Sequence, residues 1–153
     1  MQDVNLRELI EEILRDTREM VLATASEKGP WVTTLVFGHD QNLNLYWISY
    51  EVSRHTKELD KNPQVAAVVN KQPTGGGNDK GLQVEGKAFS LKEEEILHAA
   101  REYFAKRGTP HMPTTLEEAN ELAEGRSWFV LRPTKIYVYY GPLFGYDRKE
   151  YTP

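Results

Sequence analysis

The fold is decided by a stretch that changes from strand to helix, Leu43-Asn44-Leu45-Tyr46-Trp47-Ile48-Ser49, followed three residues later by Ser53-Arg54-His55-Thr56-Lys57. Apolar and aromatic residues make the first run typical of a strand. The second run opens with a serine, a common helix N-cap, and continues with basic residues. The first amides of a helix lack partners within the helix and carry partial positive charge, so they attract anions. The stretch therefore predicts a strand, a helix and a phosphate-sized anion at their junction, although an N-cap followed by solvated charges has the same local pattern.

Working outward from this stretch, the pattern of β-branched and aromatic residues predicts six further strands. They are expected at 20–24, 32–37, 65–69, 81–91, 128–131 and 135–140, with Arg132-Pro133 separating the last two. The turns joining 20–24, 32–37 and 43–49 are too short for crossover helices, so we expect these three strands to form an antiparallel meander. The sequence thus predicts one mainly β domain over 1–153, an antiparallel split barrel of six or seven strands with inserted helices.

Four helices are predicted between the strands. The first has an apolar face from Leu6 to Leu14 and a capping box formed by Asn5 and Glu8. The second runs from Ser53 to Asn62 and stops before a proline. Ser90 is expected to cap the third, and Thr114 or Thr115 a short acidic fourth helix ending at Gly125. A glycine-rich loop is expected at 74–79.

Composition excludes several classes of protein. The chain has 153 residues, a net charge of −4 and no cysteine. An acidic balance argues against nucleic acid and membrane surfaces as partners, and the lack of cysteine excludes disulfides, thiolate nucleophiles and iron–sulfur clusters. No apolar run has membrane-spanning length and no signal pattern opens the chain, so we expect a soluble, cytoplasmic protein.

Motifs of common catalytic centres are also missing. The four histidines, at positions 39, 55, 98 and 111, are scattered and have no metal-ligand spacing, so no metal site is predicted. No G-x-S-x-G sequence indicates an esterase. The glycines at 75–77 lack the Lys-Ser/Thr that follows a nucleotide-phosphate loop. No side chain stands out as a catalytic acid or base.

Small polar residues near the strand–helix junction are candidates for ligand contacts. Ser49 ends the preceding strand, and Thr33 and Thr34 lie on the strand expected to pair beside it. Gln83 alternates with the apolar Leu82 and Val84, so its amide is placed to bond the edge of a heterocycle, or simply to face water at an exposed strand. Four aromatic residues are candidates for stacking on a ring, although packing in the core or at a dimer contact is favoured for each of them: Trp47, Trp128, Tyr139 and Phe144.

Taken together, these segments resemble the pyridoxamine-phosphate oxidase-like family of FMN-binding split barrels. The resemblance extends from about Met20 to Arg148 and depends on three motifs in order. They are Tyr46-Trp47-Ile48-Ser49-Tyr50-Glu51-Val52-Ser53-Arg54-His55-Thr56-Lys57-Glu58-Leu59, Asn62-Pro63-Gln64-Val65-Ala66 and Leu82-Gln83-Val84-Glu85-Gly86-Lys87-Ala88.

The resemblance implies a cofactor, FMN, and a set of residues that contact it. Arg54 matches the phosphate-binding arginine, and His55 replaces a usual lysine, with a charge that depends on pH. Ile48 and Ser49 match the strand end beside the flavin, and residues 32–36 match a strand along the ring edge. Gln83 takes the role of a flavin-contacting glutamine, because Gly81 stands at that glutamine's position. The residues expected to contact the cofactor are Thr33, Thr34, Ile48, Ser49, Ser53, Arg54, His55, Lys57, Gln83, Tyr139 and Arg148. The resemblance also implies a homodimer with the flavin at the subunit interface.

The function implied is that of an FMN-dependent oxidoreductase acting on an unknown small molecule or electron donor. Oxidation of vitamin B6 is not expected, because the chain is short and ends in Gly145-Tyr146-Asp147-Arg148-Lys149-Glu150-Tyr151-Thr152-Pro153 instead of the segment that grips that substrate. The chain looks closer to the small general-stress-type members. Two alternatives are open: a flavin-binding module without turnover, and a deazaflavin- or haem-using member of the same barrel family.

Overall fold

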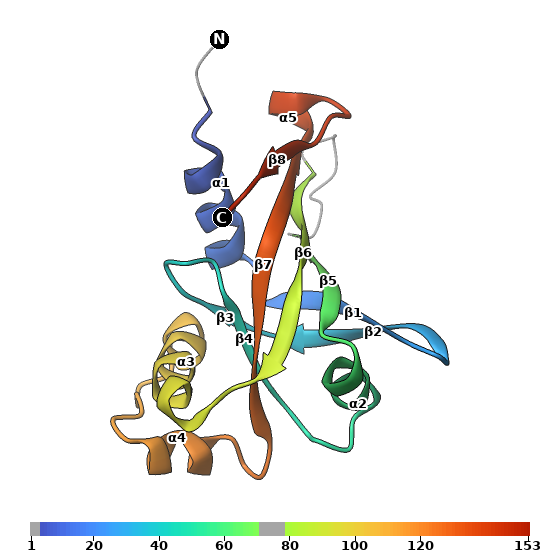
Figure 1. Ribbon diagram of the computed structural model, residues 1–153. Coiled ribbons are helices and arrows are strands. Elements are labelled where there is room, and N and C mark those ends of the chain that lie inside the picture. The colour runs from blue at the N-terminus through green and yellow to red at the C-terminus, as the bar shows by residue number, and fades with distance from the viewer. Residues whose placement is uncertain (1–3, 71–78) are drawn as a thin grey trace.

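The computed structural model describes residues 4–70 and 79–153, which form one antiparallel sheet with helices around it (Figure 1). In this part of the chain the sheet has eight strands. They are β1 (Glu19–Ser26), β2 (Gly29–Val36), β3 (Gly38–His39), β4 (Leu45–Ser49), β5 (Gln64–Asn70), β6 (Lys80–Ser90), β7 (Ser127–Tyr140) and β8 (Lys149–Tyr151). The mainly β architecture predicted from the sequence is confirmed.

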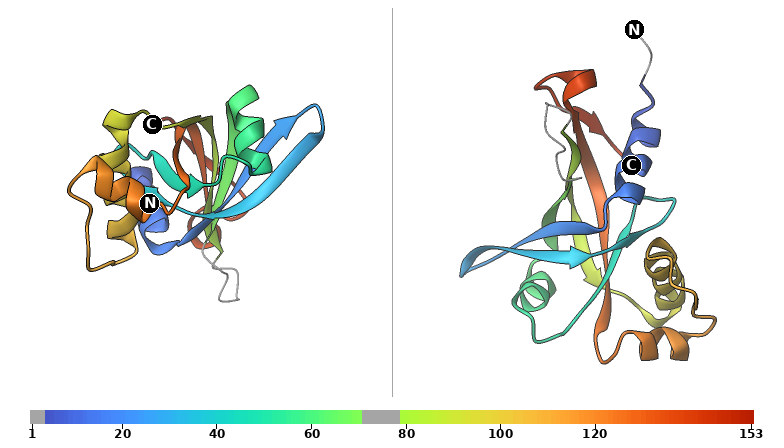
Figure 2. Two further views of the ribbon diagram at one scale, coloured as in Figure 1. Left: turned by 90° about the horizontal axis from the view of Figure 1, so that it is seen from below. Right: turned by 180° about the vertical axis from the view of Figure 1, so that it is seen from behind.

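The sheet is rolled into a partly closed barrel. Seven strands follow the order β2-β1-β5-β6-β7-β4-β3, and β8 pairs with β7 outside this path. Strands β2 and β3 are thus at opposite ends of the order, yet only Phe37 separates them in sequence. The two ends of the sheet therefore meet at Phe37, where its amide donates to the carbonyl of Arg18 over 3.4 Å. The β1–β2 hairpin extends well beyond the remaining strands (Figure 2).

Five helices of the described residues pack around the barrel: α1 (Leu6–Asp16), α2 (Arg54–Lys61), α3 (Glu93–Lys106), α4 (Leu116–Leu122) and α5 (Gly141–Phe144). Helix α2 lies beneath the β1–β2 hairpin, while α3 and α4 lie together on the other side of β4 (Figures 1 and 2). Helix α3 approaches the sheet closely, since a Cβ added at Gly38 would come within 2.5 Å of the Tyr103 Cα. Glycine at position 38 thus allows the end of α3 to rest on the barrel corner.

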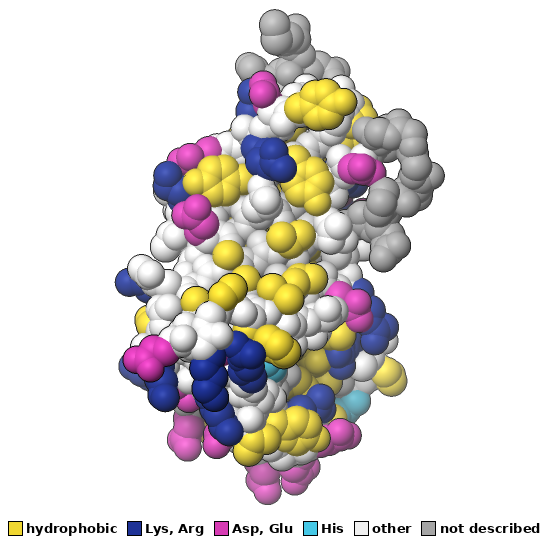
Figure 3. Space-filling model, turned by 90° about the vertical axis from the view of Figure 1, so that its right-hand side faces the viewer, with side chains coloured by type: hydrophobic (Ala, Val, Ile, Leu, Met, Phe, Trp, Pro, Cys, Tyr) yellow, Lys and Arg dark blue, Asp and Glu magenta, His cyan; other side chains and the backbone are white. Residues whose placement is uncertain are grey.

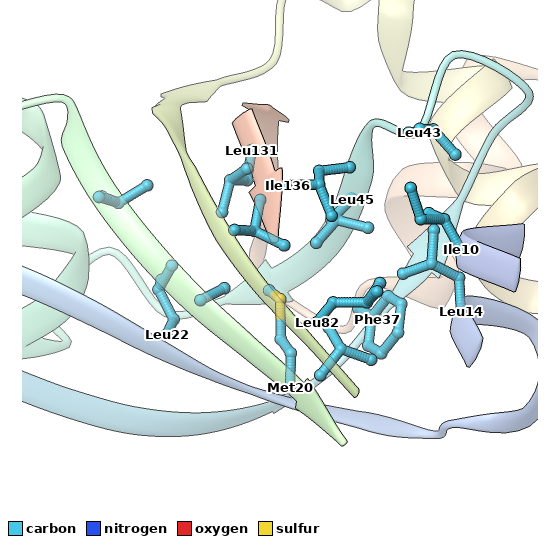
Figure 4. Close-up of a cluster of buried hydrophobic side chains, with 14 of the residues drawn as sticks. Ile10, Leu14, Met20, Leu22, Phe37, Leu43, Leu45, Leu82, Leu131 and Ile136 are labelled. Atoms are coloured by element: carbon cyan, nitrogen blue, oxygen red, sulfur yellow. The ribbon is translucent and has the colours of Figure 1, made fainter. Parts of the chain in front are cut away.

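The core divides into two clusters. The larger fills the barrel with hydrophobic residues from α1 and most strands, among them Ile10, Leu14, Met20, Leu22, Phe37, Leu43, Leu45, Leu82, Leu131 and Ile136 (Figure 4). The smaller lies between β4, β7 and the helix pair α3–α4, and contains Tyr103 and Trp128. Trp47 stacks on Phe129 at a ring distance of 5.7 Å inside the barrel. Of the aromatic residues considered for flavin stacking, Trp47 and Trp128 are therefore core residues.

Two sequence predictions about the strands are wrong. Strand β2 does not pair with β4, so only the first hairpin of the expected meander forms. The chain bends at Phe37, and β4 pairs with β3 and β7 instead. The predicted strands 128–131 and 135–140 are one continuous strand. Its pairing with β6 shifts by one residue between Glu85 and Gly86, so Thr134 is the extra residue of a bulge in β7, next to Pro133.

The helix caps follow the predictions in part. Asn5 accepts from the amides of Arg7 and Glu8, and Thr115 caps α4, as expected. Ser90 is not a cap, because it is the last residue of β6 and pairs with Phe129, so α3 begins later with Lys92 as its N-cap. Ser53 occupies the N-cap position of α2 but its hydroxyl makes no capping hydrogen bond. The predicted glycine-rich loop lies outside the described residues except for Asp79.

Within residues 4–70 and 79–153, no helix combines the length and the apolar character needed to cross a membrane.

Candidate functional site

The junction between β4 and α2 is built as the sequence predicts. Ser53 has extended backbone angles, its amide donates to Tyr50 over 3.1 Å, and its carbonyl accepts from Lys57 in the first helical turn. No acidic residue occupies the first turn of α2. The amino terminus of α2 therefore keeps its partial positive charge and a serine hydroxyl without a capping partner.

Arg54 is held in place on two sides. Its Nε donates to Glu58 Oε1 over 2.8 Å, and its guanidinium carbon lies 4.4 Å from the centre of the Trp31 ring. Glu58 also accepts from the hydroxyls of Thr24, at 2.6 Å, and Ser26, at 2.9 Å. These contacts, first of all the one with Thr24 and then the one with Arg54, lower the pKa of Glu58 from 4.5 to about 2.

A basic hollow opens beside Arg54. It has a volume of about 310 Å³ and is lined by Ser26, Lys28, Val52, Arg54, Lys57, Glu58 and Lys61. Four of these side chains are cationic and one is anionic, in a chain whose net charge is −4. Lys and Arg side chains gather in the lower half of the face shown in Figure 3, at the height of α2. Such a lining suits a phosphate.

Other predicted residues at the junction point away from this hollow. Ile48 packs in the smaller core cluster, and Ser49 is buried. The Ser49 hydroxyl and His55 Nε2 are hydrogen-bonded to each other at 2.9 Å. Burial lowers the pKa of His55 from 6.5, so its imidazole is favoured in the neutral form. The structure thus places His55 as a buried partner of Ser49, while its predicted contact with a phosphate stays a prediction.

The two threonines of β2 lie on opposite faces of the sheet. Thr33 pairs with the buried Leu22, and Thr34 pairs with Val21. Directly paired residues share a face, and successive residues alternate. Thr33 therefore faces the barrel interior, like Trp31, whereas Thr34 faces outward.

A second group of predicted residues gathers on this outer face. Arg148 Nε donates to Gln83 Oε1 over 2.6 Å, and the Arg148 guanidinium lies 5.9 Å from the centre of the Tyr139 ring. Tyr139 covers Gly81, because a Cβ added there would come within 2.3 Å of the Tyr139 Oη. The structure therefore brings together Gln83, Tyr139 and Arg148, while their contact with a flavin stays a prediction.

An apolar groove lies next to Gln83 on the outer face. It has a volume of about 470 Å³ and is lined by Val21, Ala23, Val32, Ala66, Ala67, Val68, Gln83, Val84, Glu85, Tyr137 and Arg148. The strand register explains its composition, since Thr34, Val21, Val68, Gln83 and Tyr137 form one row across five strands. Val32 is 60% exposed and Val21 is 37% exposed, so the groove floor presents apolar side chains to solvent.

The basic hollow and the apolar groove lie on opposite faces of the β1–β2 hairpin. Trp31 and Thr24, which contact Arg54 and Glu58, are on the inner face, whereas Val21 and Gln83 are on the outer face. Gln83 is also three strands away from the β2 edge, which corresponds to about 14 Å. A single flavin does not span both places within one chain without passing around the edge of the sheet.

A second basic hollow is a feature that the sequence analysis missed. Its volume is about 180 Å³, and its lining residues are Arg15, Asp16, Arg18, Val36, Phe37, Lys106 and Arg107. Lys106 Nζ lies 3.2 Å from the centre of the Phe37 ring and has no hydrogen-bond partner among the described residues. Burial lowers the pKa of Lys106 to about 7. The four basic residues come from two segments far apart in the sequence, 15–18 and 106–107, so only the tertiary structure brings them together.

No group of three or more His, Asp or Glu side chains in the described part of the chain is arranged to hold a metal ion. Asp40, the most heavily hydrogen-bonded buried carboxylate near a histidine, accepts instead from Tyr46 Oη at 2.8 Å and from the amide of Asn44 at 3.0 Å. This network fixes the turn between β3 and β4.

Solved structures that share this fold include proteins named for different properties. General Stress Protein 26 from Bacillus anthracis aligns with a TM-score of 0.69 and 19% identity, covering 98% of this chain and 100% of that chain. A heme binding protein from Mycobacterium smegmatis aligns with a TM-score of 0.75 and 15% identity, covering 99% of this chain and 60% of that chain. A FAD-binding protein from Mesorhizobium loti aligns with a TM-score of 0.66 and 18% identity, covering 87% and 90%. These likenesses show the split-barrel fold.

Sequence comparison identifies relatives and a family. A UPF0306 protein of Yersinia enterocolitica is 27% identical over 100 residues, which are 65% of this chain and 67% of that protein. The pyridoxamine 5'-phosphate oxidase family matches residues 6–140, a span that includes every helix and strand from α1 to β7. The chain therefore belongs to the pyridoxamine 5'-phosphate oxidase-like family of split-barrel proteins.

Proposed function

We propose that this protein is a homodimeric FMN-binding flavoprotein that acts in the cytoplasm as an oxidoreductase on a small molecule. The observation that carries the proposal is the separation of two complementary half-sites, a basic hollow at Arg54 and an apolar groove at Gln83, on opposite faces of one sheet. A flavin mononucleotide has the same division, with an anionic phosphate at one end and a flat, largely apolar ring at the other.

The residues of the basic hollow fit a phosphate. With Nε engaged by Glu58, Arg54 retains the N–H groups of both Nη atoms, which form a fork that matches two phosphate oxygens. Lys57, Lys28 and Lys61 add charge around the same volume. The Ser53 hydroxyl and the free amides of α2 complete the set of donors at this end.

The residues of the outer groove fit the ring. Val21, Ala23 and Val68 offer an apolar floor, and the Gln83 amide stands at its border, bonded to Arg148. Gln83 keeps its amide nitrogen as a donor toward a ring carbonyl or ring nitrogen, since the bond from Arg148 uses only its oxygen. Pockets of about 470 Å³ lie within the size range of small-molecule sites.

A second copy of the chain would unite the two half-sites. The exposed valines of the groove form a contiguous apolar surface, and such surfaces on folded proteins commonly mark interaction sites. We infer that the partner subunit covers this surface and presents its own Arg54 hollow to the phosphate. The flavin then lies at the subunit interface, with its ring against one chain and its phosphate in the other.

When bound, FMN supplies hydride and electron transfer, and the protein supplies position and environment. Arg54 and its neighbouring lysines hold the phosphate, Gln83 orients the ring edge, and the apolar groove excludes water from the ring face. No side chain of the groove is assigned as an acid or base.

The hollow around Lys106 favours a substrate with a negative charge. Three arginines line it, at positions 15, 18 and 107, together with Lys106, whose pKa of about 7 leaves it partly protonated near neutral pH. The single lining carboxylate, Asp16, lies 3.6 Å from Arg15. Phe37 lines this hollow and directly continues β2, three residues beyond Thr34, which corresponds to about 10 Å. We therefore propose that the unknown substrate is small and carries an anionic group held near Lys106 and Arg107.

The absorption spectrum of the freshly purified protein tests the proposal. We expect bands of oxidised flavin, release of FMN on denaturation, and bleaching by a reduced nicotinamide followed by recovery on addition of an electron acceptor. A bound flavin that neither bleaches nor recovers would indicate a binding module without turnover. A haem or deazaflavin spectrum would contradict the proposed cofactor.

A further inference from the structure

Two neighbouring side chains restrain Arg54. Its Nε is bonded to Glu58 at 2.8 Å, and Trp31 lies under the plane of the guanidinium at 4.4 Å. Glu58 is only 5% exposed and is itself fixed by Thr24 and Ser26. The arginine is thus tied to the β1–β2 hairpin through an aromatic face and a buried carboxylate.

We propose that Trp31 and Glu58 are positioning residues that hold Arg54 in the orientation needed for the cofactor phosphate; this inference rests on the proposed function. An arginine side chain has several rotatable bonds, and ordering them upon binding reduces affinity. Trp31 and Glu58 impose that order before the phosphate arrives. They also decide which atoms meet it, because the bond at Nε leaves the two Nη groups as the only pair available for a bidentate contact.

The position of Glu58 relative to Arg54 matters for phosphate binding, because its negative charge repels a phosphate. Its carboxylate lies on the Nε side of Arg54, and the two neighbouring hydroxyls occupy its oxygens. Lys28, Lys57 and Lys61 line the same hollow and offset its charge. If Glu58 positions Arg54, removing it weakens phosphate binding; if its charge mainly repels phosphate, removing it strengthens phosphate binding. The two effects have opposite signs.

Trp31 allows a test without any change of charge. The ring is 41% exposed, so its replacement leaves the core intact. Trp31→Leu removes the aromatic face and Trp31→Phe retains one. The contact of a cation with an aromatic face contributes enough for a change of about threefold to tenfold in a binding constant.

The measurement is the ratio of the affinities for FMN and riboflavin, which differ only in the phosphate. In the wild type we expect a preference for FMN. Trp31→Leu and Glu58→Ala are expected to reduce this preference by about threefold to tenfold and to leave riboflavin affinity unchanged. Trp31→Phe and Glu58→Gln, which retain a ring and a hydrogen-bond acceptor, are expected to restore most of it. Thermal unfolding and circular dichroism of each variant verify that it is folded.

Three results would overturn the inference while leaving the flavin site in place. They are an unchanged preference in Trp31→Leu and Glu58→Ala, an increased preference in both Glu58 variants, and an equal loss of FMN and riboflavin affinity, which would indicate a purely structural role. A wild-type protein that binds FMN and riboflavin equally would instead place the phosphate outside the Arg54 hollow. That outcome would reject this part of the proposed function together with the inference.

Discussion

The two halves of the candidate site differ in how they are built. Arg54 is fixed by contacts within its own chain, because Trp31 lies against its guanidinium and its Nε donates to Glu58, which in turn accepts from Thr24. On the outer face, the valines around Val21 have no such partners and are exposed to solvent. The phosphate end is therefore organised within the isolated chain, whereas the ring end needs a covering surface.

The largest effect is expected from a charge placed at the ring end. Val21→Asp would put a carboxylate in the outer row, and burying it against a partner subunit costs several kcal/mol, roughly 3 or more. We expect the variant to be a monomer and to lose flavin at the same time, as measured by sedimentation velocity and by absorbance. Val21→Thr, which is similar in size and uncharged, is the control. A Val21→Asp dimer that still holds FMN normally would show that this face is not the interface.

The next effect concerns the phosphate end alone. Arg54→Ala removes the guanidinium that faces the basic hollow, and we expect FMN affinity to fall by roughly 2–4 kcal/mol. Because riboflavin has no phosphate, its affinity should remain that of the wild type. Isothermal titration with both ligands measures the difference. Equal retention of FMN in the variant and the wild type would place the phosphate elsewhere.

A smaller effect with a different signature is expected from Arg148. Its contact with Gln83 orients the amide at the border of the groove, so Arg148→Ala should weaken binding by roughly 0.5–1.5 kcal/mol. Here FMN and riboflavin should lose affinity equally, because the ring is common to both. Lys149→Ala, at the next position in β8, is the matched control. A loss of affinity confined to FMN would contradict the proposed division between a phosphate end and a ring end.

The smallest effect concerns His55, whose pKa burial lowers from 6.5. The unfolded chain therefore binds this proton more tightly than the folded one, so stability should decrease as the pH falls below about 6.5 and this loss should vanish above it. We expect His55→Gln to reduce the change in unfolding free energy between pH 7.5 and pH 5.5 by less than about 1 kcal/mol. His39, whose pKa is lowered to about 4, has the same sign and is present in both proteins.

Urea unfolding of wild type and His55→Gln at the two pH values gives this difference. FMN affinity should have the same pH dependence in wild type and His55→Gln, because the His55 ring is bonded to Ser49 and lies away from the hollow. The change in charge of the FMN phosphate itself, whose second pKa is about 6, is common to both proteins. A strong decrease of FMN affinity between pH 6 and 8 that disappears in the variant would mean that a protonated His55 contacts the phosphate.

Local features of the fold were predictable from the sequence, and long-range pairings were not. Three features depend only on residues close in sequence: the cap at Asn5, the helix after Ser53 and the end of that helix at Asn62. The pairing of Ser49 with Ser127 follows from the bend of the chain at Phe37, and the continuity of β7 involves a bulge at Thr134; neither feature has a clear local pattern. The same limit explains the error at Ser90, whose strand pairing overrides its preference as a cap.

The candidate site shows the same limit. Family resemblance predicts that Arg54, Gln83 and Arg148 contact the cofactor, and the structure brings the latter two into contact with each other. Glu58 and Trp31 were not predicted, because their role depends on α2 packing against the β1–β2 hairpin. The sequence of α2 is largely charged, so it does not predict that Glu58 is buried.

The most direct test of a flavin shared between two subunits uses a mixed dimer. One chain carries Arg54→Ala and the other carries Gln83→Ala with Arg148→Ala, so that one of the two sites has both halves intact and the other has neither. We predict one FMN bound per mixed dimer with wild-type affinity, whereas each parent homodimer binds more weakly at both sites. If the mixed dimer has no site of wild-type affinity, the two halves act within one chain, and the proposal of a flavin shared between subunits is wrong.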